Sequence, residues 1–212
     1  MLRYVIFFTW PLLLLGIGCG NQTNSDDATT STKIVRDGWE GNAKYFRSEN
    51  DVIFAGDLTE SIPSNEFFCT EKIYGDFEMT LQAKLTGEGK NAGIQFRSTR
   101  IPNHHEVIGY QCDMGNMEDR YIWGSLYDES RRKTFLVHPP ADSVSQILNP
   151  DGWNDFRIRV EGHHIQIWLN DFQTVDYIES DSSIATSGII CLQIHSGPPA
   201  LAQYRGIVIR EL

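Results

Sequence analysis

Apolar and polar residues alternate in short runs along most of the chain. In one such run, Ile94 and Phe96 fall on one parity, while Gln95 and Arg97 fall on the other. Successive side chains of a β-strand point to opposite faces, so each run predicts a strand that buries one face and presents the other. Helical periodicity is scarce in this sequence.

Runs of this kind recur throughout the chain, with Gly, Pro, Asn and Asp between them, as expected for strands joined by turns. The predicted strands are Ala43–Arg47, Asp51–Phe54, Glu66–Thr70, Gly75–Leu85, Ala92–Ser98, Val107–Asp113, Tyr121–Tyr127, Lys133–Val137, Asn154–Glu161, His164–Leu169, Gln173–Tyr177, Gly188–His195 and Arg205–Arg210. Many strands without intervening helices indicate an all-β fold of two packed antiparallel sheets, a β-sandwich of the jelly-roll type.

The first residues read as an export signal. Arg3 is followed by an apolar run from Tyr4 to Ile17 that is short for a membrane span, and small residues precede Cys19. Residues 1–18 therefore predict a signal peptide. The cysteine after it resembles a bacterial lipobox, with Leu15 one position further upstream than usual, so Cys19 is a candidate lipidation site. A plain secretory signal is the alternative, and both predict an exported protein.

Residues 19–33 predict a flexible tether, because Gly20–Lys33 is polar and contains no large apolar residue to bury. Residues 34–212 are long enough for one domain with its own core. The chain has a formal net charge of −10 and no basic stripe, which argues against nucleic acid as a partner. Contact with a membrane is expected through the lipid anchor only.

Three cysteines lie in the predicted domain: Cys69, Cys112 and Cys191. This number allows at most one disulfide, and free buried thiols are the expectation for all three. Cys112 shares the parity of apolar neighbours and is expected in the core. No Cys/His spacing typical of zinc sites is present.

Three of the predicted strands pair an amide with an ionisable residue on their polar face. These pairs are Gln95 with Arg97, Gln111 with Asp113, and Gln193 with His195. A solvated sheet face is the alternative, since half-exposed strands alternate whatever their role. Solvated faces more often carry residues such as Glu78 and Lys84, which lie in the predicted strand Gly75–Leu85. The amide-rich pairs therefore favour the interpretation that these three strands form the floor of one polar cleft.

A series of motifs along the chain carries a family resemblance. In order they are Tyr74-Gly75-Asp76-Phe77-Glu78, Asn91-Ala92-Gly93-Ile94-Gln95-Phe96-Arg97, Trp153-Asn154, Ile167-Trp168-Leu169-Asn170, Leu192-Gln193-Ile194-His195 and Tyr204-Arg205. From about Asp37 to Leu212 the sequence resembles the 3-keto-disaccharide hydrolases, also described as 3-keto-glucoside 1,2-lyases with a paired hydratase activity. Ala92 departs from the family's common Ser, and Asp171 from its usual Gly. The resemblance implies a concanavalin-like sandwich and an enzyme that acts on an oxidised (3-keto) disaccharide or glucoside.

The candidate residues suit an elimination better than direct hydrolysis. The Glu-x-Asp-x-Glu spacing that glucanase sandwiches carry on one strand face does not occur here. In a 3-keto-glucoside the ketone acidifies the C2 hydrogen, so a base can remove it and the C1 oxygen can leave. The resemblance implies this scheme, followed by hydration of the glucal, with a divalent metal ion as a candidate cofactor that polarises the ketone.

Four residues are candidates for the chemistry. His195 is proposed as base or metal ligand, since its ordinary pKa lies near neutrality, with a structural histidine as the alternative. Asp113 is proposed as metal ligand or base, or else as a strand-ending turn residue. Glu129 is a candidate acid, or else an ion-pair partner of Arg131 or Arg132. Arg97 is a candidate donor to the sugar or the enolate, or else a partner of Asp113.

The remaining candidates concern binding. The substrate-binding candidates are Gln95, Gln111, Trp123, Tyr127, Arg131 and Gln193, with the two aromatic residues as stacking platforms for a pyranose ring. His104, His105 and Glu106 crowd one loop, where the absence of a third ligand at a set spacing makes a metal site a weak hypothesis.

Two classes of function remain at this stage: an exported lyase or hydrolase of 3-keto-glucosides, and a non-catalytic, envelope-tethered carbohydrate-binding module. They differ in whether Asp113, Glu129 and His195 converge on one sugar site.

Overall fold

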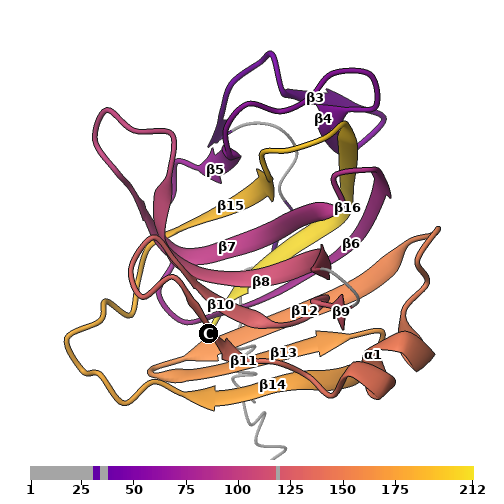
Figure 1. The fold of residues 1–212 in the computed structure, drawn as a ribbon. Coiled ribbons are helices and arrows are strands. Elements are labelled where there is room, and N and C mark those ends of the chain that lie inside the picture. Colours follow the sequence, from indigo (N-terminus) through magenta and orange to yellow (C-terminus); the bar gives the residue numbers. More distant parts are fainter. Residues whose placement is uncertain (1–30, 34–37, 118–119) are drawn as a thin grey trace, which may run out of the picture.

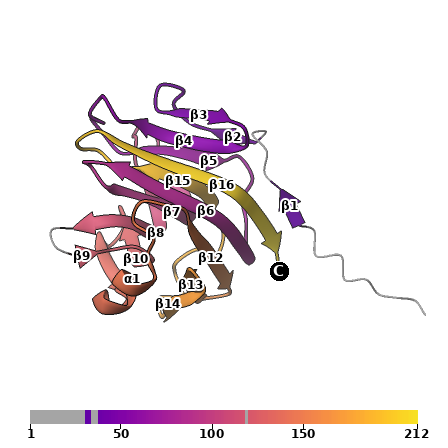
Figure 2. The same ribbon diagram turned by 90° about the vertical axis from the view of Figure 1, so that its right-hand side faces the viewer.

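The computed structural model describes residues 31–33, 38–117 and 120–212, which fold as two antiparallel sheets packed face to face (Figure 1). Sheet A has the strand order β14-β13-β12-β6-β16-β4-β3, with β1 against β16. Sheet B has the order β11-β10-β8-β7-β15-β5-β2, with β9 against β8. This arrangement, viewed from the side in Figure 2, confirms the predicted jelly-roll β-sandwich.

Sheet A consists of β1 (Ser31–Lys33), β3 (Phe46–Glu49), β4 (Val52–Asp57), β6 (Phe77–Gly87), β12 (Asn154–Glu161), β13 (His164–Leu169), β14 (Phe172–Ile178) and β16 (Ala200–Glu211). Sheet B consists of β2 (Trp39–Glu40), β5 (Glu66–Thr70), β7 (Asn91–Arg100), β8 (Val107–Met117), β9 (Arg120–Tyr121), β10 (Leu126–Glu129), β11 (Thr134–Val137) and β15 (Ile189–Ile194). A short helix, α1, spans Ala141–Ile147.

Most predicted strands overlap the observed ones, and β5, β12 and β13 have the predicted bounds. The prediction Ala43–Arg47 starts too early, because residues 43–45 form a turn before β3, and strands β1 and β2 were not predicted. The predicted strand Tyr121–Tyr127 instead divides into β9 and β10, with residues 122–125 forming a turn between them. Helix α1 was not predicted, because its seven residues are too few for a helical period to appear against the strand pattern.

The two sheets bury their faces differently. Strands of sheet A alternate buried and partly exposed residues, as in β13, so this sheet has one solvated face. In sheet B, β7 is buried continuously from Ala92 to Ser98, and β8 from Gly109 to Gly115. The polar residues on the outer face of sheet B are therefore shielded from water, unlike the polar residues of a solvated sheet face.

Part of this cover comes from the tip of the β7–β8 hairpin, residues 99–108, which folds over the outer face of sheet B. The fold begins at a bulge where Arg97 has a φ of +48° and the β7–β8 register shifts. Gly109 and Gly188 permit the close approach, since a Cβ on either would lie 2.1 to 2.4 Å from atoms of the bulge. Val107 then reaches a small apolar cluster with Phe67, Cys69 and Cys191, although β5 lies two strands away from β7.

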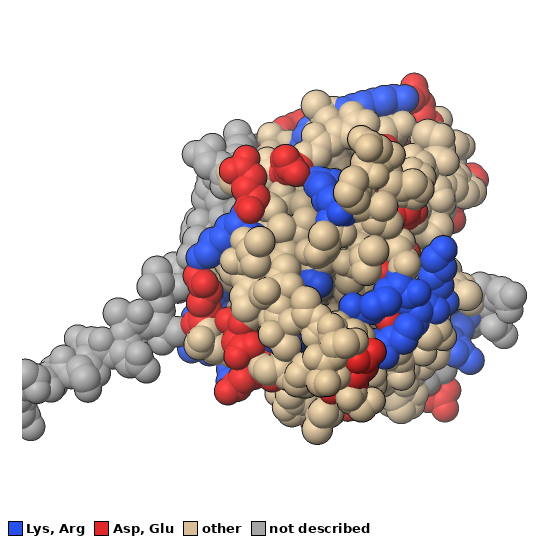
Figure 3. Space-filling model, turned by 90° about the vertical axis from the view of Figure 1, so that its left-hand side faces the viewer, with Lys and Arg blue, Asp and Glu red and all other residues tan. Residues whose placement is uncertain are grey.

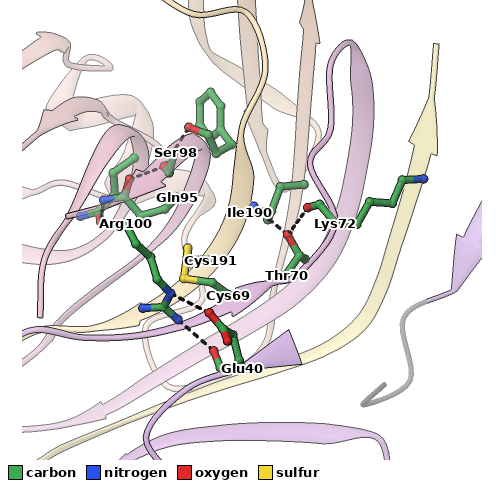
Figure 4. Close-up of a disulfide and its surroundings, with 11 residues drawn as sticks. Glu40, Cys69, Thr70, Lys72, Gln95, Ser98, Arg100, Ile190 and Cys191 are labelled. Atoms are coloured by element: carbon green, nitrogen blue, oxygen red, sulfur yellow. Dashed lines mark hydrogen bonds and ion pairs between the residues drawn. A yellow bond between two sulfur atoms is a disulfide. The ribbon is translucent and has the colours of Figure 1, made fainter. Parts of the chain in front are cut away.

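Cys69 and Cys191 form a disulfide, which corrects the expectation of three free thiols. They lie directly opposite one another in the antiparallel pair β5 and β15 (Figure 4). Such a pairing depends on the register between strands that are 122 residues apart in the chain, which parity within one strand cannot reveal. Cys112 is buried and free, as expected.

The predicted signal peptide (residues 1–18) and Cys19 lie outside the described residues. Of the predicted tether, residues 31–33 form β1, which pairs with the edge of β16. In residues 31–33, 38–117 and 120–212, no helix has the length and apolar character needed to cross a membrane.

Removing the disulfide should lower stability without changing the fold. A Cys69→Ser/Cys191→Ser double variant is expected to lose about 2–5 kcal/mol of unfolding free energy, because the cross-link closes a long loop in the unfolded chain. Urea unfolding with and without reductant measures this loss. A Cys112→Ala variant is the control and should keep the dependence on reductant. If the double variant were as sensitive to reductant as the wild-type protein, the assignment of the disulfide would be contradicted.

Candidate functional site

A pocket of about 550 Å³ opens on the outer face of sheet B, above β8 and β10. Its lining residues are Asn65, Asn91, Gln111, Asp113, Met117, Ile122, Tyr127, Glu129, Lys133, Thr134, Phe135 and His195. Asp113 comes from β8, Glu129 from β10 and His195 from just beyond the end of β15. Asp113, Glu129 and His195, whose convergence the sequence left open, thus line the same pocket.

Register across the sheet explains how these side chains meet. Gln95, Gln111 and Tyr127 are direct neighbours on β7, β8 and β10, and Gly93 lies opposite Asp113. Gly93 leaves room for the side chain of Gln111, since a Cβ at this position would lie 2.6 Å from the Gln111 carboxamide carbon. Gln111 therefore occupies the space that any larger residue at position 93 would fill.

A chain of hydrogen bonds runs along the outer face of sheet B and ends at Gln111 and Asp113 in the pocket. The Ser98 hydroxyl donates to Gln95 Oε1 at 3.1 Å, and Gln95 Nε2 donates to Gln111 Oε1 at 2.8 Å. Gln111 Nε2 in turn donates to Oδ1 of Asp113. Each amide in the chain has a fixed orientation, because its oxygen accepts from one neighbour and its nitrogen donates to the next. Gln95 and Ser98 act on the site only through Gln111.

Asp113 is a buried carboxyl group whose side chain is held by an amide. Burial raises its pKa to about 8, and the charge of Glu129 adds to the rise, while the Gln111 hydrogen bond opposes it. Most Asp113 side chains are therefore neutral at pH 7. Because Oδ1 accepts from Gln111, Oδ2 is the oxygen that carries the proton and can donate it to a ligand.

His195 is oriented by the backbone that follows it. Its Nδ1 lies 2.7 Å from the carbonyl oxygen of Ser196, and a carbonyl can only accept, so Nδ1 carries the hydrogen. In the neutral ring, Nε2 then has a free lone pair and can act as a base. The backbone N–H of His195 donates to the carbonyl of Asn91 at 3.2 Å, which fixes the end of β15 against β7.

Glu129 and Tyr127 form another wall of the pocket. Burial, and next the charge of Glu106, raise the pKa of Glu129, which accepts hydrogen bonds from the N–H and hydroxyl of Ser130. Tyr127 packs edge-on against Phe135, with ring centroids 4.9 Å apart. Both rings line the pocket and present apolar surface to it.

The alternative role of Glu129 as an ion-pair partner is not what the structure shows. Arg131 and Arg132 pair with Asp128, and Arg132 also pairs with Glu179. Arg131 further lies over the ring of Tyr110, 4.7 Å from its centroid. Arg131 therefore lies outside the pocket, contrary to its nomination as a substrate-binding residue.

Four other nominated residues also lie away from the pocket lining, and one of them is Gln95, which reaches the site only through Gln111. Arg97 turns away at the bulge and pairs with Asp76 at 2.8 Å instead of Asp113. Trp123 is in the core and stacks on Phe156 of sheet A, so it offers no platform for a sugar. Gln193 lies on the same outer face but is fully buried. Neither atom of its amide has a hydrogen-bond partner among the residues that the structure describes.

Several lining residues were not nominated from the sequence. Asn65 precedes β5, and Phe135 belongs to β11, so both reach the pocket through contacts distant in sequence. Asn91 opens β7 on the same parity as Gln95, which is the one local signal that could have identified it. Its Oδ1 is buried and has no hydrogen-bond partner within the described part of the chain.

The residues present do not form a metal centre by themselves. Asp113 and His195 were the predicted ligands, but the described ranges contain no group of three or more His, Cys, Asp or Glu side chains placed to hold a metal ion. A zinc or calcium ion usually needs more protein ligands than these two supply.

Charge on the molecular surface is mixed. The face shown in Figure 3 carries acidic and basic side chains in separate small groups, and no continuous basic stripe crosses it. This face therefore has no continuous positively charged surface to which a phosphate backbone would bind.

The raised pKa of Asp113 has a consequence for stability. In the unfolded chain the group titrates near 4, whereas in the fold it keeps its proton to about pH 8, so unfolding free energy should fall as the pH rises from about 4 to 8. An Asp113→Asn variant should not show this decline. In the wild-type protein the decline in unfolding free energy should reach the order of a few kcal/mol by pH 8. Urea unfolding at pH 5, 7 and 9 tests it, and parallel profiles for both proteins would contradict it.

Comparison with solved structures places the fold among carbohydrate-related sandwiches. A protein of Parabacteroides distasonis ATCC 8503 that carries the provisional name glycosyl hydrolase is 19% identical, with a TM-score of 0.59 over 82% of this chain and 94% of that one. The carbohydrate binding module CBM66 from Bacillus subtilis is 12% identical, with a TM-score of 0.63 over 82% and 96%. A Bacillus subtilis protein with a galectin-like fold is 11% identical, with a TM-score of 0.57 over 82% and 88%. These identities show a shared fold alone.

A search of curated proteins found no match to this chain. The family described as the 3-keto-alpha-glucoside-1,2-lyase-like domain, in contrast, matches residues 33–210, which include every strand of sheet B and all of the pocket residues. On that match, the chain belongs to the family of 3-keto-alpha-glucoside-1,2-lyase-like domains.

Proposed function

We propose that this protein is an enzyme that cleaves 3-keto-glucosides, including 3-keto-disaccharides, by elimination across C1 and C2 and then hydrates the product. The observation that carries the proposal is the neutral, amide-held Asp113 on the floor of a pocket that also contains His195 and Glu129. An elimination next to a ketone needs a base, a donor to the developing enolate and an acid for the leaving oxygen.

The first step removes the C2 proton. Nε2 of His195 accepts it, and the electrons of the C2–H bond move toward the C3 carbonyl to form an enolate. The O–H of Asp113 donates a hydrogen bond to this oxygen. A neutral carboxyl in a buried site stabilises an oxyanion without placing a negative charge beside it.

The second step breaks the bond between C1 and the leaving oxygen. The enolate electrons form the C1–C2 double bond, the C3 ketone returns, and Glu129 gives its proton to the departing oxygen. The raised pKa of Glu129 supports this role, because burial favours the protonated form of the group. The products are the released alcohol or sugar and a 2-hydroxy-3-keto-glucal.

Hydration reverses the proton movements. Water adds to C1 while the Glu129 carboxylate takes one of its protons, and the His195 imidazolium returns a proton to C2. The sum of the two stages is hydrolysis, and every group ends in its starting state. A divalent ion that polarises the ketone stays a prediction, and this scheme does not require one.

We also propose that the enzyme is exported and held in the cell envelope by a lipid on Cys19. The Cys69–Cys191 disulfide supports an oxidising compartment, since disulfides rarely persist in the cytosol. Labelling with a radioactive fatty acid is expected to modify the wild-type protein and not a Cys19→Ser variant. Equal labelling of both, or of neither, would contradict the anchor.

A non-catalytic carbohydrate-binding module is the second candidate. The two aromatic rings of Tyr127 and Phe135 in a polar pocket support it, because apolar sugar faces pack on aromatic surfaces. A binding module would keep its ligand intact, so cleavage separates the two candidates.

The purified protein should release free monosaccharide from 3-keto-trehalose or 3-keto-lactose. A His195→Gln variant is expected to lose about 10²- to 10⁴-fold in kcat, because it lacks the base. A His164→Gln variant, which changes a histidine on sheet A, should retain full activity. Product is measured by chromatography, with and without a chelator to test the predicted metal.

No release from any 3-keto substrate would remove the support for the lyase, and intact binding in the same samples would favour the binding module. Equal activity of the two histidine variants would contradict the role of His195.

A further inference from the structure

Asn91 lines the pocket at the start of β7, and its side-chain oxygen lacks a hydrogen bond. Several buried side-chain atoms have no partner within residues 31–33, 38–117 and 120–212, and Asn91 Oδ1 is the one among them whose residue lines the pocket. A buried acceptor without a donor lowers stability, so native proteins rarely keep one without a reason. An unpaired acceptor in the lining of a pocket indicates a hydrogen-bond donor on the ligand.

Asn91 lies on the strand between the two residues that act on the sugar in the proposed scheme. β7 has β8 on one side and β15 on the other. The carbonyl of Asn91 accepts from the backbone N–H of His195 at 3.2 Å, so these two residues are neighbours across β7 and β15. On the other side, Asp113 is the cross-strand partner of Gly93, two residues along β7 from Asn91. Asn91 is therefore placed between His195 and Asp113, and all three line the pocket.

The donors near Asn91 already have other acceptors. Gln111 Nε2 donates to Asp113, and Asn65 Nδ2 donates to Glu106 at 3.0 Å. Directly opposite Asn91 on β8 is Gly115, which has no side chain to offer. A rotation about the last side-chain bond of Asn91 turns its oxygen toward a ligand, and the hydrogen bond gained there ends the unpaired state.

We propose that Asn91 determines specificity for the hydroxyl group at C2 of the 3-keto ring, from which its Oδ1 accepts a hydrogen bond. This inference rests on the proposed function. In that scheme His195 takes the hydrogen from C2, and Asp113 donates to the oxygen on C3, the neighbouring carbon. The hydroxyl on C2 lies between these two points of the substrate, as Asn91 lies between the two residues.

This contact also orients the hydrogen that is removed. C2 is tetrahedral, so a ring held by its C2 and C3 oxygens has a fixed direction for the C2–H bond, and this bond is aimed at Nε2 of His195. A site that binds a hydroxyl group discriminates against an analogue without it, because the acceptor is then left unpaired. The pocket should therefore prefer a 3-keto-glucoside over its 2-deoxy analogue.

A binding measurement tests this contact apart from catalysis. Methyl 3-keto-glucoside and its 2-deoxy analogue are titrated by calorimetry into a His195→Gln protein, which leaves both ligands largely intact. The 2-deoxy analogue should bind about 10- to 100-fold more weakly, because it leaves Oδ1 unpaired. Adding Asn91→Leu should make the two affinities equal, whereas Asn91→Asp, which keeps a side-chain acceptor, should preserve the preference.

The matched control is Asn116→Leu, which changes an exposed asparagine of β8 outside the pocket lining and should also preserve the preference. Equal affinity of the two ligands for the folded His195→Gln protein would overturn the proposal. A preference that Asn91→Leu leaves unchanged would do the same.

Kinetics measure the preference in the active protein. The ratio of kcat/KM for the two substrates, with and without the C2 hydroxyl, should fall by about 10- to 100-fold in Asn91→Leu relative to the wild-type protein. Cleavage with the same ratio in both proteins would overturn the role of Asn91 and leave the proposed function standing. A binding preference that depends on Asn91, without cleavage of either substrate by the wild-type protein, would count against the proposed function alone.

Discussion

The burial of an uncharged carboxyl group on the face of a β-sheet is the constraint on which the site depends. A buried carboxylate needs a counter-charge, and the structure gives Asp113 an amide instead. The group therefore keeps its proton to about pH 8. The amide chain that holds it works only because Gly93 leaves space for Gln111. Burial thus determines the protonation of Asp113, while one missing side chain and two oriented glutamines determine its direction.

The cover over this face is as important as the floor below it. Without the folded-over hairpin tip, the disulfide cluster on which Val107 packs would be more open to water. The bulge at Arg97 and the small residues Gly109 and Gly188 make the fold-over possible. The disulfide holds β5 to β15 beneath it, so the covalent link and the hairpin stabilise the same layer.

Alternation along the chain was enough to predict the sandwich and to place Gln95, Gln111 and Asp113 on one face, because parity is a local property of a strand. It failed at Arg97, where one bulge reverses the direction of the side chain. Parity also could not show that Trp123 turns into the core between two short strands. The disulfide and Asn65 depend on which strands become neighbours, and this information is not local in the sequence.

The buried, protonated Asp113 distinguishes the proposed elimination from ordinary glycoside hydrolysis. A retaining glycosidase needs one ionised carboxylate as nucleophile beside one neutral acid. In this pocket burial raises the pKa of both Asp113 and Glu129, and at about 8 the pKa of Asp113 leaves that group largely neutral at pH 7, so Asp113 is not the ionised nucleophile that a retaining glycosidase needs. The available base is instead a histidine nitrogen, which suits removal of a carbon-bound proton that a neighbouring ketone has acidified. A substrate without the ketone lacks that acidity, so the proposed elimination requires the oxidised sugar.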